Sequence, residues 1–150
     1  MMFLILLITV LLDQGSKAMV QMMMYHGESI AVLPPFFYLT YILNPGAAFG
    51  LLAYQTPLFV TVAVLLALGV LLGYKRLPRE RYTLRCGLSL ILGGALGNLA
   101  DRLRHGFVVD FIDFRVFPVF NLADTAIVAG ACFLVWELIK NDDKQQKGNE

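Results

Sequence analysis

Residues 57–74 read PLFVTVAVLLALGVLLGY and contain no charged side chain. A helix that crosses the hydrocarbon core of a bilayer needs roughly 17–25 mostly apolar residues, so this stretch is long enough to span a membrane. The whole chain has the same character, because 58% of its 150 residues are hydrophobic and only 15% are charged. Soluble domains have about 45–50% apolar and about 25% charged residues. The sequence therefore predicts a membrane protein.

Three further stretches have the length and composition of membrane spans. The first of them, at about residues 2–24, could instead be a signal peptide. However, no basic residue precedes its apolar core and no small-residue cleavage site follows it. Its apolar character continues through Asp13 and Lys17, so we interpret it as a helix that stays attached. The predicted spans are about residues 2–24, 57–74, 83–100 and 122–139, within one membrane-embedded domain of residues 1–140.

Basic residues gather on one side of the predicted spans. They lie in the link between the second and third spans and in the tail after the fourth span, and basic residues of this kind mark cytoplasmic segments. Both termini should then be cytoplasmic and the other two connections extracytoplasmic. The polar tail, residues 141–150, is expected to be disordered. The residues concerned are Lys75, Arg76, Arg79, Arg81, Arg85, Lys140, Lys144 and Lys147.

The two outer connections have the composition of β-strands. Residues 36–43 read FFYLTYIL between Pro34-Pro35 and Asn44-Pro45-Gly46, and residues 107–117 read FVVDFIDFRVF. Aromatic and β-branched runs bounded by Pro, Gly and Asn favour strands. We expect β elements within about residues 29–50 and 103–119, which form a small sheet on the outer membrane surface. The alternative is that both segments are interfacial loops.

Polar side chains in or beside the predicted spans gather at the outer level. A central Asp or Lys costs about 2.5–3.5 kcal/mol on insertion scales, so such residues usually have a function. We therefore expect a site at the extracytoplasmic interface. Its candidate residues are Asp13, Lys17, Asn98, Asp101, Arg102, Asn121 and Asp124 from the spans, with Asn44 and Asp110 from the connections.

Two local patterns predict how these residues are supported. Asp13 and Lys17 are four residues apart, so they share a helix face and can form an ion pair, for which we favour a structural role. Gly93 and Gly97 form a small-x-x-x-small pattern that lets helices approach closely in lipid. Because Asn98 follows Gly94 by one helical turn, this packing would press Asn98 into the interior.

The carboxyl groups differ in their sequence neighbours. Asp13 has Lys17 and Asp101 has Arg102, whereas Asp124 has no basic residue nearer than Arg115. A carboxyl without a partner charge at a lipid boundary is a candidate for acid–base chemistry. In an extended strand, Asp110 and Asp113 point to opposite faces, so only one of them can face Asp124. The residue pattern leaves open which one does.

Five motifs, in this order along the chain, resemble those of the lipoprotein signal peptidases (signal peptidase II). The resemblance covers nearly the whole chain and uses all the polar residues singled out above. The motifs are DQGSK at residues 13–17, NPGAAFG at 44–50, GGALGNLADR at 93–102, VVDFID at 108–113 and FNLAD at 120–124.

The resemblance implies an all-α membrane protein of four transmembrane helices with a small extracytoplasmic β-cradle, in the bacterial inner membrane. It implies that Asp110 and Asp124 form a catalytic aspartate dyad that needs no metal or other cofactor. The substrate would be a prolipoprotein whose cysteine carries diacylglycerol, cut immediately before that cysteine, and membrane lipids would surround a monomer. Asn44, Asn98, Arg102 and Asn121 would line the substrate site, supported by Asp13, Lys17, Asp101 and Gly94.

Other classes of protein fit the sequence less well. A transporter subunit or proton pathway would need polar residues at mid-depth and on the inner side. A serine protease would need a serine with a histidine base, which Ser16, Ser29 and Ser89 lack. With only His26 and His105, and with both cysteines in apolar stretches, a zinc site is poorly supplied. The net charge of +1 gives no reason to expect a nucleic acid partner.

Overall fold

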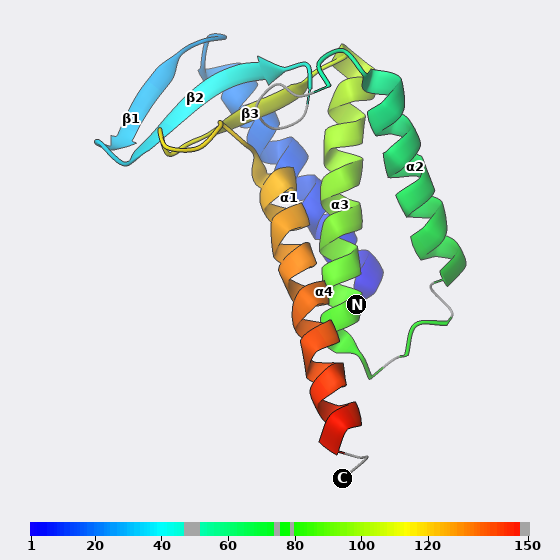
Figure 1. Cartoon of the computed structure of the whole chain (residues 1–150). Helices are drawn as coiled ribbons and strands as arrows, with labels where there is room; N and C mark the ends of the chain where they lie inside the picture. The colour runs from blue at the N-terminus through cyan, green and yellow to red at the C-terminus, as the bar shows by residue number, and fades with distance from the viewer. Residues whose placement is uncertain (47–51, 74–75, 79, 148–150) are drawn as a thin grey trace.

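The computed structural model describes residues 1–46, 52–73, 76–78 and 80–147. Its four helices are α1 (Met2–Met23), α2 (Thr56–Gly73), α3 (Tyr82–His105) and α4 (Leu122–Lys147). Each is long and apolar enough to cross a membrane. A small sheet lies at one end of the helices, and both termini lie away from it (Figure 1). The predicted fold, four spans with a small sheet, is confirmed.

The ends of several elements differ from the expectation. Residues 103–105 belong to α3, which ends where Gly106 adopts a left-handed conformation (φ 82°) that suits glycine. Helix α4 continues to Lys147, so residues 141–147, which were expected in the tail, are helical in the structure. Residues 141–147 contain no proline or glycine that would end the helix. Residues 47–50, expected within a β element, and residues 148–150 lie outside the described part of the chain.

The sheet consists of β1 (Ser29–Leu33), β2 (Phe37–Asn44) and β3 (Val108–Asp113), antiparallel and with β2 in the middle. The two outer connections therefore pair with each other, which favours the sheet over the alternative of two loops. On β2 and β3, Asn44 pairs with Val108 and Ile42 pairs with Asp110. Asn44 and Asp110 are thus diagonal neighbours on the same face of the sheet, within reach of each other.

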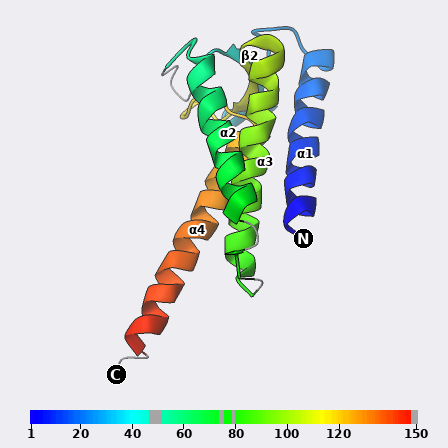
Figure 2. The same ribbon diagram turned by 90° about the vertical axis from the view of Figure 1, so that its right-hand side faces the viewer.

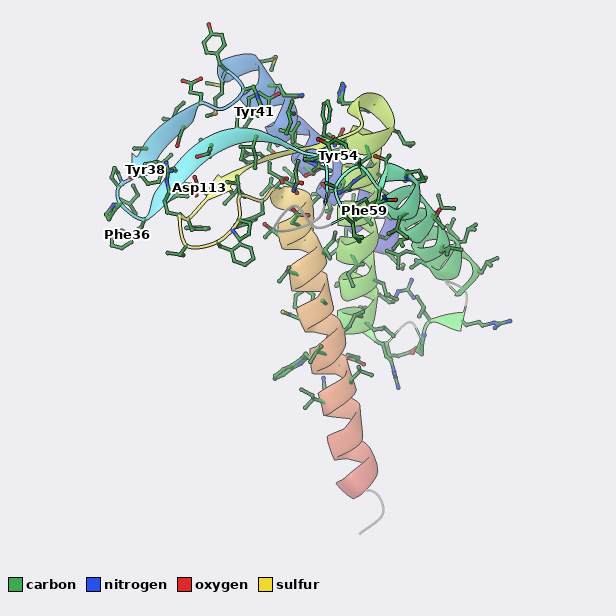
Figure 3. The ribbon with its side chains drawn as sticks, turned by 45° about the horizontal axis from the view of Figure 1, so that its top comes forward. Phe36, Tyr38, Tyr41, Tyr54, Phe59 and Asp113 are labelled. Carbon is green, nitrogen blue, oxygen red and sulfur yellow. The ribbon has the colours of Figure 1, made fainter. Side chains whose placement is uncertain are left out.

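One end of the sheet packs on α1. Val20 and Met24 at the end of α1 form an apolar cluster with Tyr41 of β2 and with Val109 and Phe111 of β3. In Figure 3, Tyr41 lies near α1, whereas Phe36 and Tyr38 lie at the free end of the sheet. This packing fixes β3, and with it Asp110, relative to the membrane helices.

Helix α3 contacts all three other helices, and Figure 2 shows it between α1 and α2. Small residues allow the close contact with α4. A Cβ atom on Gly94 would overlap the carbonyl oxygen of Ala123 and lie 2.8 Å from Cγ1 of Ile127. A Cβ on Gly87 would lie 2.9 Å from the carbonyl oxygen of Gly130. The predicted close approach at Gly93 and Gly97 is confirmed mainly towards α1, because a Cβ on Gly93 would lie 2.8 Å from Cβ of Thr9 and one on Gly97 would overlap Oδ2 of Asp13. The close contact of α3 with α4 brings Asn98 against the start of α4.

Candidate active site

Asp110 projects from β3 into the space between the sheet and the helices, and only 1% of its surface is exposed. Its Oδ2 atom accepts a hydrogen bond from Nδ2 of Asn44 over 2.9 Å. Its Oδ1 atom accepts one from Nδ2 of Asn121 over 2.6 Å. The register of β2 and β3 explains the first contact, because it puts Asn44 diagonally opposite Asp110.

Asp113 follows Asp110 by three residues in the strand β3, so the alternation of a strand puts its side chain on the other face of the sheet. Its Oδ2 atom accepts a hydrogen bond from Oγ1 of Thr40 over 2.7 Å and lies 3.5 Å from Nε of Arg115. The Arg115 guanidinium covers the ring of Tyr38 at 3.8 Å from its centre. Asp113 therefore holds the free end of the sheet together, which leaves Asp110 as the β3 carboxyl near α4.

Asp124 is held in the first turn of α4 by a reciprocal cap. The Oδ1 atom of Asn121 accepts a hydrogen bond from the backbone N–H of Asp124 over 2.9 Å. In return, Oδ2 of Asp124 accepts one from the backbone N–H of Asn121 over 3.3 Å. This is the geometry of a capping box, which satisfies N–H groups that have no partner within the helix. Oδ1 of Asp124 also accepts a hydrogen bond from Nδ2 of Asn98 over 2.8 Å.

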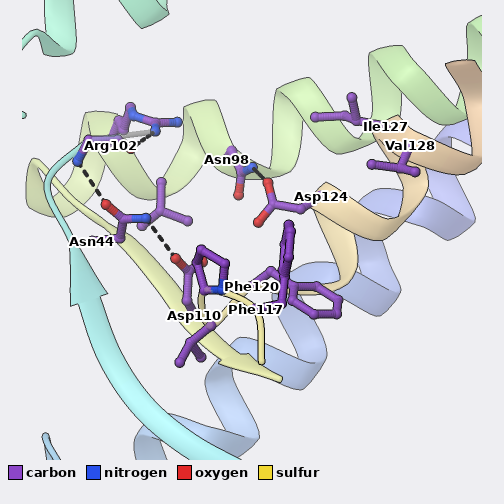
Figure 4. Close-up of a pocket in the computed structure, with 13 residues that line it drawn as sticks. Asn44, Asn98, Arg102, Asp110, Phe117, Phe120, Asp124, Ile127 and Val128 are labelled. Atoms are coloured by element: carbon purple, nitrogen blue, oxygen red, sulfur yellow. Dashed lines mark hydrogen bonds between the residues drawn. The ribbon is translucent and has the colours of Figure 1, made fainter. Parts of the chain in front are cut away.

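Asp110 and Asp124 line one cavity of about 230 Å³, together with the predicted residues Asn44, Asn98 and Arg102. Figure 4 shows both carboxyls facing this cavity, one from the sheet and one from α4. Two aspartates from consecutive motifs, one on a strand and one on a helix, thus share one site. The remaining lining residues are mostly apolar, so charges in the cavity are poorly hydrated.

The buried environment perturbs the ionisation of Asp110. Burial is the largest effect and raises the pKa of Asp110 to about 7. The hydrogen bond from Asn44 opposes this rise in pKa, while the negative charge of Asp124 adds to it. Two carboxyls that repel each other across one cavity favour a state in which one holds a proton and the other is charged.

Lys17 lies behind the cavity, 2% exposed, at the centre of an ion network. Its Nζ atom is 2.9 Å from Oδ2 of Asp13 and 2.9 Å from Oδ2 of Asp101. The predicted ion pair of Asp13 and Lys17 is confirmed, and Asp101 joins it. Lys17 also donates to Oδ1 of Asn98 over 2.9 Å. Because an ammonium group only donates, this contact turns the amide nitrogen of Asn98 towards Asp124.

Each acid of the network also holds a backbone group of another element. Oδ1 of Asp13 accepts a hydrogen bond from the N–H of Ala123 over 2.9 Å, at the start of α4. Oδ2 of Asp101 accepts one from the N–H of Val109 over 3.3 Å, on β3. The network therefore fixes the two elements that carry Asp124 and Asp110.

Gln14 is a member of this network that the sequence reasoning missed. Its Nε2 atom donates to Oδ1 of Asp101 over 2.9 Å, and its Oε1 atom accepts from Nη1 of Arg104 over 2.7 Å. The available signal was an amide side chain within a membrane helix, which usually hydrogen-bonds across helices. Gln14 extends the network to the outer surface of α3.

Two residues expected to line the substrate site differ in where they lie. Arg102 does line the cavity, and it donates to the carbonyl oxygen of Gly46 over 2.8 Å while covering the Phe59 ring at 4.2 Å. Asn121 is fully buried behind the carboxyls, and does not line the cavity. Its Nδ2 atom donates to Asp110 and also to Oδ1 of Asn98 over 3.1 Å. Asn121 thus bridges the two aspartates from behind.

A metal centre has no obvious place in the described part of the chain. Among those residues, no group of three or more His, Cys, Asp or Glu side chains lies close enough to hold an ion. The absence of a metal from the reaction stays a prediction.

The chain is similar to proteins of known name along almost its full length. A protein of Pelotomaculum thermopropionicum named lipoprotein signal peptidase is 60% identical over 145 residues, which cover 97% of this chain and 95% of that protein. A protein of the same name from Moorella thermoacetica is 56% identical and covers 91% of this chain and 92% of its own length.

A solved structure and a family model extend these similarities to the fold and the motifs. A structure described as a bacterial membrane enzyme superposes with a TM-score of 0.87 at 30% identity, covering 95% of this chain and 90% of its own. The family model described as signal peptidase (SPase) II matches residues 5–140. That range contains the whole cavity and its supporting network. The chain belongs to the signal peptidase II family of membrane proteases.

Proposed function

We propose that this protein removes the signal peptide from prolipoproteins whose cysteine carries diacylglycerol, and that it cuts the bond before that cysteine with Asp110 and Asp124. The observation that carries the proposal is the meeting of these two buried carboxyls, from β3 and α4, at one cavity. Relatives named lipoprotein signal peptidase support the choice of substrate.

In the proposed reaction, the charged carboxylate takes a proton from a water molecule, whose oxygen attacks the scissile carbonyl carbon. The protonated partner donates a hydrogen bond to the carbonyl oxygen and stabilises the tetrahedral intermediate. The C–N bond then breaks, and the leaving amine takes a proton from the dyad. Because the pair titrates as a unit, neither aspartate is assigned as the base of the resting enzyme.

The surrounding amides have different roles in this proposal. Asn44 and Asn98 each donate to one catalytic carboxyl and also face the cavity, so they can contact the substrate backbone. Arg102 faces the cavity and can bind a substrate carbonyl group. Asn121 contacts both aspartates from behind and acts as a positioning residue. We assign a supporting role to Asp13, Lys17, Asp101 and Gly94.

The four apolar helices and the family make this a multi-pass protein of the inner membrane. We propose that both termini are cytoplasmic and that the sheet and the cavity are extracytoplasmic. The substrate is then held in the outer leaflet by its acyl chains, with the bond to be cut at the depth of the lipid headgroups. This tethering lowers the entropic barrier to bringing the bond to the dyad. The monomeric state remains a prediction.

The test uses the purified full chain with a diacylglyceryl precursor peptide and its unlipidated form. Asp110→Asn and Asp124→Asn should each abolish cleavage while the protein stays membrane-inserted. The matched control is Asp113→Asn, on the same strand but the opposite face, which should retain most of the activity. Activity of the unchanged protein should persist in a metal chelator. Robust cleavage by either dyad variant would refute the mechanism.

A further inference from the structure

A second cavity, of about 580 Å³, opens beside the active site under the segment that follows β3. We refer to it as the α4 groove. One wall is the first part of α4, and the other is the segment between β3 and α4, which leads from the sheet to the beginning of that helix in Figure 1. The lining residues are Phe114, Val116, Phe117 and Phe120 from the segment, and Asp124, Thr125, Val128 and Ala129 from α4.

The α4 groove and the active-site cavity share part of their walls. Phe117, Phe120, Asp124 and Val128 line both of them. The rings of Phe117 and Phe120 meet edge to face, with centres 6.0 Å apart. Figure 4 shows these two rings beside Asp124. A ligand in the groove therefore has one end next to a carboxyl of the dyad.

The chemistry of the groove wall favours hydrocarbon. Its two polar side chains already have hydrogen-bond partners: Oγ1 of Thr125 donates to the carbonyl oxygen of Asn121 over 3.0 Å, and the Asp124 oxygens accept from Asn98 and Asn121. The other lining residues are aromatic or aliphatic. A peptide bound there would bury amide groups without partners, which is unfavourable, whereas a saturated chain would not.

The groove continues into a lipid-facing strip of α4. Val128 is 63% exposed, and Cys132 and Trp136 follow it at intervals of four residues, both exposed, on the same face of the helix. This strip runs from the groove towards the end of α4 that lies away from the sheet. A chain that is too long for the groove can therefore extend along α4 into the bilayer.

We propose that the α4 groove binds one acyl chain of the substrate's diacylglyceryl group and thereby places the lipidated cysteine beside the dyad. This inference rests on the proposed function. The shared wall argues for the substrate rather than a bulk membrane lipid as the source of the chain. A chain in the groove has its glyceryl end next to Asp124, where the lipidated cysteine must lie when the preceding bond reaches the dyad.

The test is to fill the groove without touching the active-site cavity. Ala129 lines the groove and not the cavity, so Ala129→Phe should occupy the space of the acyl chain. The matched control is Ala131→Phe, an exposed position on α4 outside both cavities. The substrates are one precursor peptide in three forms: with two palmitoyl chains, with two butyryl chains, and unlipidated.

The measurement is kcat/KM for each substrate with the purified full chain. Losing the burial of a few methylene groups lowers affinity by about tenfold or more, so Ala129→Phe should lower kcat/KM for the palmitoyl substrate by at least about this factor. The value for the butyryl substrate should be unchanged. Ala131→Phe should leave both values as in the unchanged protein.

The other possible outcomes overturn the inference, and they show whether the proposed function fails with it. If Ala129→Phe leaves the palmitoyl-to-butyryl ratio unchanged while cleavage continues, the groove does not hold the substrate's chain, and the proposed function stands. The inference also falls, and the proposed function stands, if the palmitoyl-to-butyryl ratio of kcat/KM changes with the acyl-chain length of the lipid in which the protein is assayed. The groove would then bind bulk lipid. If the unchanged protein cleaves no diacylglyceryl precursor, both the inference and the proposed function fall.

Discussion

Lys17 on α1 donates a hydrogen bond to Oδ1 of Asn98 on α3 over 2.9 Å, and together with Asn121 it holds the amide nitrogen of Asn98 towards Asp124. With the oxygen turned to Lys17, the amide nitrogen donates to the carboxylate over 2.8 Å. Lys17 does not line the active-site cavity. A residue outside the cavity therefore helps to orient a hydrogen-bond donor within it.

We expect Lys17→Met to destabilise the protein strongly, because Asp13 and Asp101 would be left as buried charges without a partner, at a cost of about 3–5 kcal/mol. The triple variant Asp13→Asn, Lys17→Met, Asp101→Asn removes these charges and should regain most of the stability. Its kcat should remain about 10–100-fold low, because Oδ1 of Asn98 loses its charged donor and keeps only Asn121, and a hydrogen bond to a charged group is worth about 1.5–3 kcal/mol. Thermal unfolding and cleavage kinetics check the two effects separately. Full recovery of kcat would show that Lys17 is only structural.

The pKa of Asp110, raised by burial to about 7, predicts a pH dependence of activity. The dyad needs one proton, so kcat/KM should fall as the pH rises through about 7 and that proton is lost. A pH–rate profile with the lipidated precursor measures this. A flat profile across neutral pH would contradict the shared-proton mechanism.

The same pKa predicts a pH dependence of stability. The folded state binds a proton at Asp110 with a pKa of about 7, against an ordinary value of 3.8. The stability that this proton contributes is fully present below 3.8 and is lost as the pH rises through about 7. Asp110→Asn cannot ionise, so its unfolding midpoint should fall less than that of the unchanged protein over this window. Parallel curves for the two proteins would count against the raised pKa.

Gly94→Ala should weaken both folding and catalysis. The added Cβ would overlap the carbonyl oxygen of Ala123 and push α4, which carries Asp124, away from α3. Overpacking of this kind costs about 1–3 kcal/mol. The control is Gly69→Ala in α2, where no atom lies within 4 Å of the new Cβ. Unfolding midpoints and kcat should both fall for Gly94→Ala, and equal values for the two variants would contradict this packing.

The proposed orientation predicts the location of fused reporters. A reporter fused after Lys140 should stay in the cytoplasm, because the basic link and tail mark that side. A reporter inserted near Glu28, between α1 and β1, should be extracytoplasmic. Accessibility of the two reporters to a membrane-impermeant label measures their sides. Labelling of both reporters from the same side of the membrane would contradict the four-span arrangement.

Composition and motif order were enough to predict the membrane spans and the sheet, and to single out polar residues that the structure brings together around one cavity. Helix ends were less predictable, because residues 103–105, which include Arg104 and His105, were expected within the second β element but continue α3 until Gly106. The choice between Asp110 and Asp113 depended on strand register. Asn44 lies diagonally opposite Asp110, and this pairing is a property of the sheet that spacing within β3 does not contain.

The hydrogen-bond directions of the site could not be predicted at all. Asn98 contacts Lys17, 81 residues earlier, and Asp124, 26 residues later. An asparagine side chain can donate on one side and accept on the other, so its orientation follows from partners on other elements. The same reason explains why Gln14, which joins α1 to Asp101 and Arg104, was missed.

The hydrogen bond from the Ala123 N–H to Asp13 links the first membrane helix to the beginning of the last one. During biosynthesis, α1 is translated before α4. The carboxylate of Asp13 therefore has no Ala123 N–H to bind until the beginning of α4 has been made. A ribosome-bound chain that ends before α4 thus has neither Asp124 nor a complete ion network. We therefore expect no activity before α4 is present, and an α1–α3 fragment coexpressed with an α4 fragment should regain activity by assembling at this contact.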